Sequence, residues 1–214
     1  MDTKNSFTQH LIVGIFSLGL VTISKFLLEA PWSTSFARVS FVLLFLILII
    51  GPIMRIQKPK TILSPLASPW SWRWELGIWF FITALVHFII ILTGSSFSSL
   101  IKIGGGGFWL ANLLWLVALF WALLLTATSF EKVISYLGIL SWKSLHSFTY
   151  VVFYLVSGHF IYFQFFSTYW KTGPDWFGYT SITMIIILII LQFTAFIMTV
   201  LKKRHELNLG NNKD

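Results

Sequence analysis

The chain has 214 residues, of which 57% are hydrophobic and only 10% are charged, whereas about a quarter of the residues of a soluble protein are charged. This composition excludes an ordinary soluble enzyme and predicts an all-α integral membrane protein embedded in a lipid bilayer. The formal net charge of +8 does not indicate a nucleic-acid partner, because the basic residues of membrane proteins gather in cytoplasmic loops. The sequence has no cysteine, so any redox centre needs histidine ligands or a bound cofactor.

Six apolar runs, each long enough to cross a bilayer, follow one another along the chain. They lie at about residues 7–28, 37–56, 70–93, 108–129, 144–166 and 179–201. The first run is too long for a cleaved signal peptide, and no small-residue cleavage site follows it. We therefore predict a single six-helix transmembrane domain over residues 1–206, followed by a short polar tail at 207–214 that frays.

The distribution of basic residues predicts the orientation of these spans. With six spans, both termini and the second and fourth loops share one side, which holds eleven of the fifteen Lys and Arg residues. The remaining four are Lys25, Arg38, Lys102 and Lys171. Because basic residues stay on the cytoplasmic side, both termini are expected in the cytoplasm, with the chain in the inner (plasma) membrane as a multi-pass protein. The odd-numbered spans then run outward.

The stretch WKSLHSFTYVVFYLVSGHFIY, residues 142–162, places His146 and His159 thirteen residues apart in an aromatic and aliphatic segment. Along one helix this spacing is about 20 Å, so the two histidines lie at two depths. A buried imidazole is costly unless it is hydrogen-bonded or ligated, which makes each one a candidate functional residue. A hydrogen bond to a neighbouring Ser or Thr is the simpler alternative for either histidine.

A third histidine, His87, matches His159 in depth. His87 lies about six residues before the outer end of the third run and His159 about seven before the outer end of the fifth, a difference of about 1.5 Å. Two imidazoles at one depth on separate helices can ligate a b-type haem axially. We therefore predict that His87 and His159 bind haem b. Ser157 and Gly158 offer a small surface either to the macrocycle or to a packed helix.

His146 lies nearer the cytoplasmic surface, where the third run has no histidine to face it. Its candidate partners are His10, near the inner end of the first run, and His205, just beyond the sixth. One interpretation is that His146 binds a second haem together with one of these two histidines. The other is that His10 and His205 are ordinary histidines at the membrane interface.

Three segments carry a family resemblance: WELGIWFFITALVH at 74–87, LTATS at 125–129, and WKSLH at 142–146 with a second histidine thirteen residues later. Their order and spacing resemble the ferric reductase-like transmembrane domain family. Within it they are closest to the MsrQ/YedZ branch, the haem-binding membrane subunit of a bacterial methionine sulfoxide reductase system. The resemblance covers about residues 51–166.

This resemblance implies a six-helix b-type cytochrome with His87 and His159 as haem ligands and His146 as a third haem-associated histidine. It also implies electron transfer from quinol or a cytoplasmic flavin reductase to a periplasmic redox protein, which in that branch is a molybdenum-containing reductase. Because no nucleotide-binding domain is present, a partner must supply the electrons. The chain would then be an electron-transfer subunit with no catalytic residue of its own. The acceptor is expected to dock on the loops at 94–107 and 167–178.

Other functions stay open at this point. A ferric or other metal reductase component would use the same haem ligands. A haem-free transporter would relay protons through the histidines, with Asn112 and Gln192 lining a polar path, although no Asp or Glu lies well inside a span. A structural assembly subunit would need none of the histidines. The run Gly104–Gly107 lacks the strand and lysine of a phosphate-binding loop, so we interpret it as a flexible loop.

Overall fold

The computed structural model describes residues 6–56, 72–102, 109–166 and 173–211, and the regular structure in these ranges is helical. The helices are α1 (Ser6–Thr22), the π-helical η2 (Ile23–Leu27), α2 (Trp32–Ile56), α3 (Arg73–Gly94), α4 (Phe97–Leu100), α5 (Trp109–Ala127), α6 (Glu131–Leu137), α7 (Ile139–His146), α8 (Thr149–Ile161), the π-helical η5 (Tyr162–Phe166) and α9 (Trp176–Asn211).

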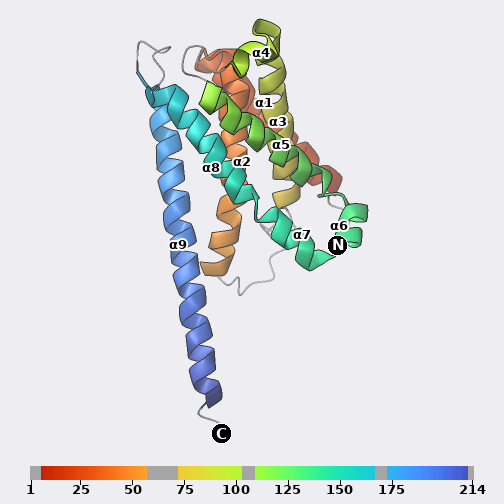
Figure 1. Cartoon of the computed structure of the whole chain (residues 1–214), viewed down its shortest axis with the longest axis vertical. Helices are drawn as coiled ribbons and strands as arrows, with labels where there is room; N and C mark the ends of the chain where they lie inside the picture. Colours follow the sequence, from red (N-terminus) through yellow and green to blue (C-terminus); the bar gives the residue numbers. More distant parts are fainter. Residues whose placement is uncertain (1–5, 57–71, 103–108, 167–172, 212–214) are drawn as a thin grey trace.

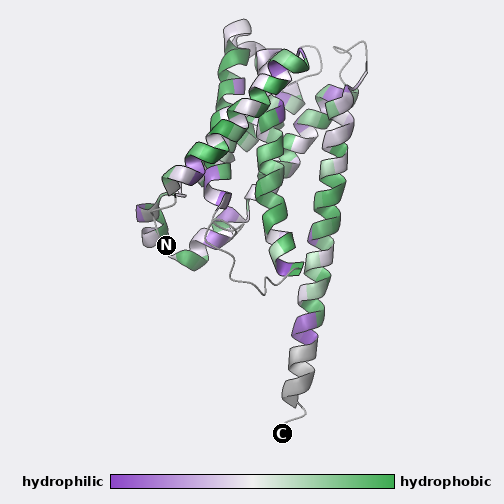
Figure 2. Ribbon diagram, turned by 180° about the vertical axis from the view of Figure 1, so that it is seen from behind, coloured by the Kyte–Doolittle hydropathy of each residue, from purple (hydrophilic) through white to green (hydrophobic). Residues whose placement is uncertain are grey.

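Six segments of the described chain are long and apolar enough to cross a membrane, which confirms the prediction of a multi-pass membrane protein. They are Phe7–Leu27, Trp32–Ile56, Arg73–Gly94, Trp109–Ala127, Ile139–Phe166 and Trp176–Arg204. Figure 2 shows hydrophobic residues along the long helices and a hydrophilic turn far down α9. In a helix the backbone N–H and C=O groups bond to one another, as a lipid environment without water requires.

The helices are longer than predicted at two places. Helix α2 begins at Trp32 rather than near residue 37, and the Pro31 carbonyl accepts a hydrogen bond from the Ser35 amide at 2.9 Å. Proline is compatible with a helix start because its missing N–H is not needed there. Helix α9 continues through Asn211, past the basic residues 202–204. The predicted polar tail is therefore helical as far as it is described.

The fifth span is not the continuous helix that the sequence predicts. Helix α7 ends at His146 and α8 begins at Thr149. In the intervening turn the Ser147 hydroxyl donates to the Ser144 carbonyl at 2.6 Å, a local bond that competes with the helical ladder. Gly138, with a φ of 75°, separates α6 from α7 in a conformation that favours glycine.

Figure 1 shows how these segments are arranged. One end of the bundle carries α4, the starts of α2, α5 and α9, and the ends of α3 and η5; we call it the α4 end. The opposite end carries α6 and α7 together with the start of α1, and we call it the α7 end. Helix α2 packs mainly on α3 and α9, and α5 packs mainly on α8.

The core centres on α2. Phe41, Leu43, Leu44 and Leu48 are fully buried, and the Phe41 ring contacts Phe153 of α8 at a centroid distance of 5.8 Å. Replacing one of these buried leucines by alanine would lower the free energy of unfolding by about 2–5 kcal/mol. Helix α2 thus fixes α3 and α8, the two helices that carry His87 and His159.

Candidate functional site

His87 lies on α3 toward the α4 end, and its Nδ1 atom is held by the start of α2. The Nδ1 atom lies 2.9 Å from the Ser33 carbonyl oxygen and 3.1 Å from the Ser33 hydroxyl. A carbonyl oxygen only accepts hydrogen bonds, so Nδ1 carries the proton and donates it. The Nε2 atom then keeps its lone pair and is the ring nitrogen available to a metal.

His159, on α8, has the same arrangement with a different helix. Its Nδ1 atom lies 2.9 Å from the carbonyl oxygen of Ala111, in the first turn of α5. The proton is therefore again on Nδ1 and the lone pair on Nε2. Metal-ligating histidines commonly donate their second ring N–H to a carbonyl, which fixes the tautomer and the orientation of the ring. The two histidines share this feature independently.

The Trp115 indole of α5 lies against both imidazoles. Its ring centroid is 5.6 Å from that of His87, in an edge-on contact, and 6.0 Å from that of His159, in a tilted contact. No spacing in the sequence predicts the contact between Trp115 and the two histidines. The structure thus brings His87 and His159 to one level around a shared aromatic side chain.

These residues fit a haem in their donor chemistry. In the described part of the chain, no group of three or more His, Asp or Glu side chains is placed to hold a metal ion. A two-imidazole site instead suits a haem iron, because the porphyrin supplies the remaining ligands. The Trp115 indole contacts both rings, so a haem held by these two histidines would take the place of this side chain. His87 and His159 would be the residues that hold the haem iron.

His146 lies at the α7 end, away from the other two histidines. Its ring packs on Trp142 at a centroid distance of 4.3 Å, and its Nε2 atom is 3.5 Å from the Thr128 hydroxyl oxygen. The segments LTATS and WKSLH therefore meet here in space. The Thr128 hydroxyl beside His146 is the kind of neighbour expected if this histidine only forms a hydrogen bond and binds no haem. The backbone carbonyl of the candidate His10 accepts a hydrogen bond from Trp79 Nε1 at 3.1 Å, which concerns the backbone of His10 and not its imidazole. The side chain of the other candidate, His205, lies outside the described residues.

The burial of one acidic residue, Glu75, is not predicted from the sequence. Glu75 is in the first turn of α3, near the end of the span, and only 2% exposed. Its Oε2 atom has no hydrogen-bond partner among the described residues. A carboxylate near a helix start is favourable to the helix dipole, which is the one sequence signal that could have marked it.

The side chain of Asn112 donates to the Leu100 carbonyl at 2.9 Å and so ties α5 to α4. The Nε2 atom of Gln192, on α9, and the hydroxyl of Ser157, on α8, are buried and have no hydrogen-bond partner among the described residues. A Cβ on Gly158 would meet Leu114 at 3.4 Å, which is ordinary helix packing. The loop residues 103–107 and 167–172, where an acceptor is predicted to dock, lie outside the described residues.

No protein-family model matches the chain, and no curated protein matches it either. Fold and site together define a multi-pass helical membrane protein with a pair of similarly oriented histidines near one end of its bundle.

Proposed function

We propose that the chain is a b-type cytochrome of the ferric reductase-like kind, an electron-transfer subunit in a multi-pass membrane protein. The observation that carries this proposal is the matched state of two histidines. His87 and His159 each donate Nδ1–H to a backbone carbonyl, and each contacts the same indole. A histidine in an apolar core also needs a partner for its N–H, so the hydrogen bonds alone do not favour haem. The proposal depends on the two histidines lying beside one indole with the same ring nitrogen, Nε2, left without a proton.

The chain's own residues would orient the ligands and keep water away. The Ser33 and Ala111 carbonyls hold the two ring planes, and they strengthen the Nε2 atoms as donors by accepting from Nδ1–H. Apolar helices around the pair lower the local polarity, which is one determinant of a reduction potential. When bound, haem supplies a one-electron couple of its iron.

The direction of electron flow follows from the orientation predicted by the basic residues. With both termini in the cytoplasm, the His87–His159 pair lies toward the periplasmic face and His146 toward the cytoplasmic face. Quinol or a flavin reductase would donate electrons, and a periplasmic redox protein would accept them. A molybdenum-containing methionine sulfoxide reductase is the acceptor that the family resemblance favours. By the same resemblance, His146 would be a third, haem-associated histidine, and its described neighbours are Trp142 and Thr128.

Absorption spectroscopy of the purified protein tests the cytochrome assignment. We expect reducible b-type bands in wild-type protein expressed with ample haem. His87→Ala and His159→Ala should each lose the low-spin spectrum, because one imidazole alone leaves a coordination position open. His10→Ala is the matched control and should keep the wild-type spectrum. A colourless wild-type protein would instead favour the haem-free transporter.

A separate measurement tests the partner and direction. Haem in sealed membrane vesicles of known orientation is exposed to quinol, or to NAD(P)H with a soluble flavin reductase, and its reduction is followed optically. Reduction by either system at the cytoplasmic face supports the proposed path. Reduction only from the periplasmic face would overturn the direction and leave the haem assignment standing.

A further inference from the structure

A buried arginine lies on the side of α2 that faces α1 and α9. Arg38 is only 8% exposed, and its Nη2 atom forms an ion pair with Asp175, just before α9. Its guanidinium also lies over the rings of Trp176 and Phe177, at centroid distances of 5.3 Å and 5.5 Å. Burying a charge is costly unless all its donors find partners, so the environment of this arginine has to satisfy more than one nitrogen.

Two of these donors are not satisfied. The Nε and Nη1 atoms of Arg38 have no hydrogen-bond partner among the described residues, and neither has the hydroxyl of Ser24 on η2. Ser24 is 5% exposed. Buried polar groups in folded proteins are almost always paired, so several orphaned donors around one space indicate a missing acceptor.

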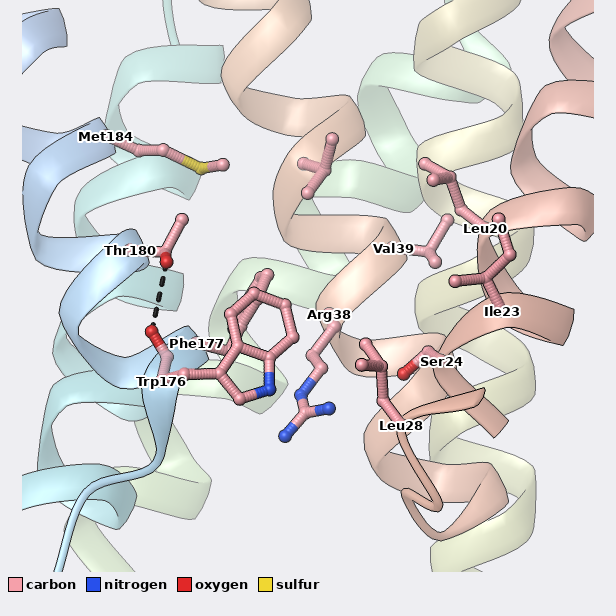
Figure 3. Close-up of a pocket in the computed structure, with 11 residues that line it drawn as sticks. Leu20, Ile23, Ser24, Leu28, Arg38, Val39, Trp176, Phe177, Thr180 and Met184 are labelled. Atoms are coloured by element: carbon pink, nitrogen blue, oxygen red, sulfur yellow. Dashed lines mark hydrogen bonds between the residues drawn. The ribbon is translucent and has the colours of Figure 1, made fainter. Parts of the chain in front are cut away.

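Arg38 and Ser24 border the same cavity, of about 250 Å³, between α1, η2, α2 and α9. Its other walls are mainly apolar and include Leu20, Val42 and Met184. Figure 3 shows the guanidinium, the Ser24 hydroxyl and the Trp176 ring at one end, while Met184 lies at the other. The cavity is therefore polar at one end and apolar along the rest of its length.

The rim of this cavity is exposed toward the surroundings of the bundle. Ile23, Leu28 and Trp176 line it and are 49%, 42% and 53% exposed. Arg38 lies six residues after Trp32, the first residue of α2, which is about 9 Å along the helix. Arg38 therefore lies near one end of the apolar segment Trp32–Ile56 and not at its middle. The π-helical turn η2, a type of turn common at functional sites, presents Ser24 to the cavity.

We infer that this cavity binds a membrane phospholipid, with the oxygen atoms of its phosphate and glycerol ester region on Arg38 and Ser24, the first carbons of one acyl chain along the apolar walls, and the rest of the lipid outside the cavity in the bilayer. A phospholipid head offers several acceptors close together, as the clustered donors require. A quinone carries its two carbonyl oxygens at opposite ends of a flat ring, and the unsatisfied donors lie at one end of this cavity. The inference is independent of haem binding.

Native mass spectrometry of the full chain tests this inference. Wild-type protein in mild detergent is titrated with phosphatidylglycerol, with phosphatidylethanolamine and, separately, with a ubiquinone of similar length. We expect one phospholipid molecule to bind per chain, and to bind in preference to the quinone. Arg38→Gln removes the donors, and Val42→Phe fills the cavity without touching the ion pair, so each should weaken phospholipid binding about tenfold or more. Leu123→Phe, at an exposed position of α5, is the control and should bind as the wild type does.

Two variants are needed because Arg38→Gln removes the charge of a buried ion pair and could fold poorly. Val42→Phe leaves Arg38 and Asp175 in place, so it tests phospholipid binding in either case. Unchanged phospholipid binding in a folded Val42→Phe protein would overturn the inference. So would equal weakening by Leu123→Phe, absence of any bound phospholipid in the wild type, or preference for the quinone.

Discussion

The contact between α1 and α3 can be tested with one added methyl group. A Cβ built on Gly14 would lie 2.5 Å from Cζ2 of Trp79, closer than packed atoms tolerate. Trp79 cannot easily retreat, because its Nε1 donates to the His10 carbonyl of α1 at 3.1 Å. Overpacking of this kind costs about 1–3 kcal/mol, while replacing glycine in a helix by alanine returns up to about 1 kcal/mol. We therefore expect Gly14→Ala to lower the free energy of unfolding.

Gly19, on the same helix, provides the matched control because nothing lies within 4 Å of its added Cβ. Gly19→Ala has only the gain in helix stability, so the two variants should differ by about 1–3 kcal/mol. Reversible unfolding in mixed detergent micelles, followed by circular dichroism, measures this difference. If both variants unfold at the same denaturant concentration, the close approach of α1 and α3 is wrong.

Three further predictions concern the sites. Trp115→Leu should retain haem with an unchanged low-spin spectrum, because a haem held by the two histidines would take the place of the indole; loss of haem from this variant would show that the indole helps to hold it. His146→Ala should keep the low-spin bands assigned to the other pair, and a spectrum as disturbed as that of His159→Ala would contradict the separation of the two levels. Asp175→Ala should destabilise the protein by about 1–3 kcal/mol, because it leaves the buried Arg38 without its counter-ion; this is less than the loss for a fully buried pair, since the Asp175 side chain is 36% exposed. Glu29→Ala, at an exposed position, should unfold like the wild type.

Sequence predicts the spans well because length and hydropathy decide which segments a bilayer accepts. It fails within the fifth span, since the turn at residues 147 and 148 contains no Pro or Gly. The Ser147 hydroxyl in that turn donates to the Ser144 carbonyl, and such bonds also occur inside the continuous helices α2 and α3, so a serine does not mark the break. The π-helical turns η2 and η5 have no sequence signature either.

The candidate site divides in the same way. Helix rise alone places His87 and His159 at one depth, so the pair follows from the sequence. Their hydrogen bonds to Ser33 and Ala111 depend on how α2 and α5 pack, which no local pattern specifies. The pairing of Arg38 with Asp175 joins residues 137 positions apart, and only the folded bundle brings them together.

The central claim is that two imidazoles ligate one haem iron. Electron paramagnetic resonance of the oxidised protein, together with near-infrared magnetic circular dichroism, reports the axial ligands directly. We predict a low-spin signal typical of bis-imidazole ligation in the wild type and in His10→Ala, and its loss in both His87→Ala and His159→Ala. A wild-type protein without haem, or a bis-imidazole signal that survives both substitutions, would contradict the claim.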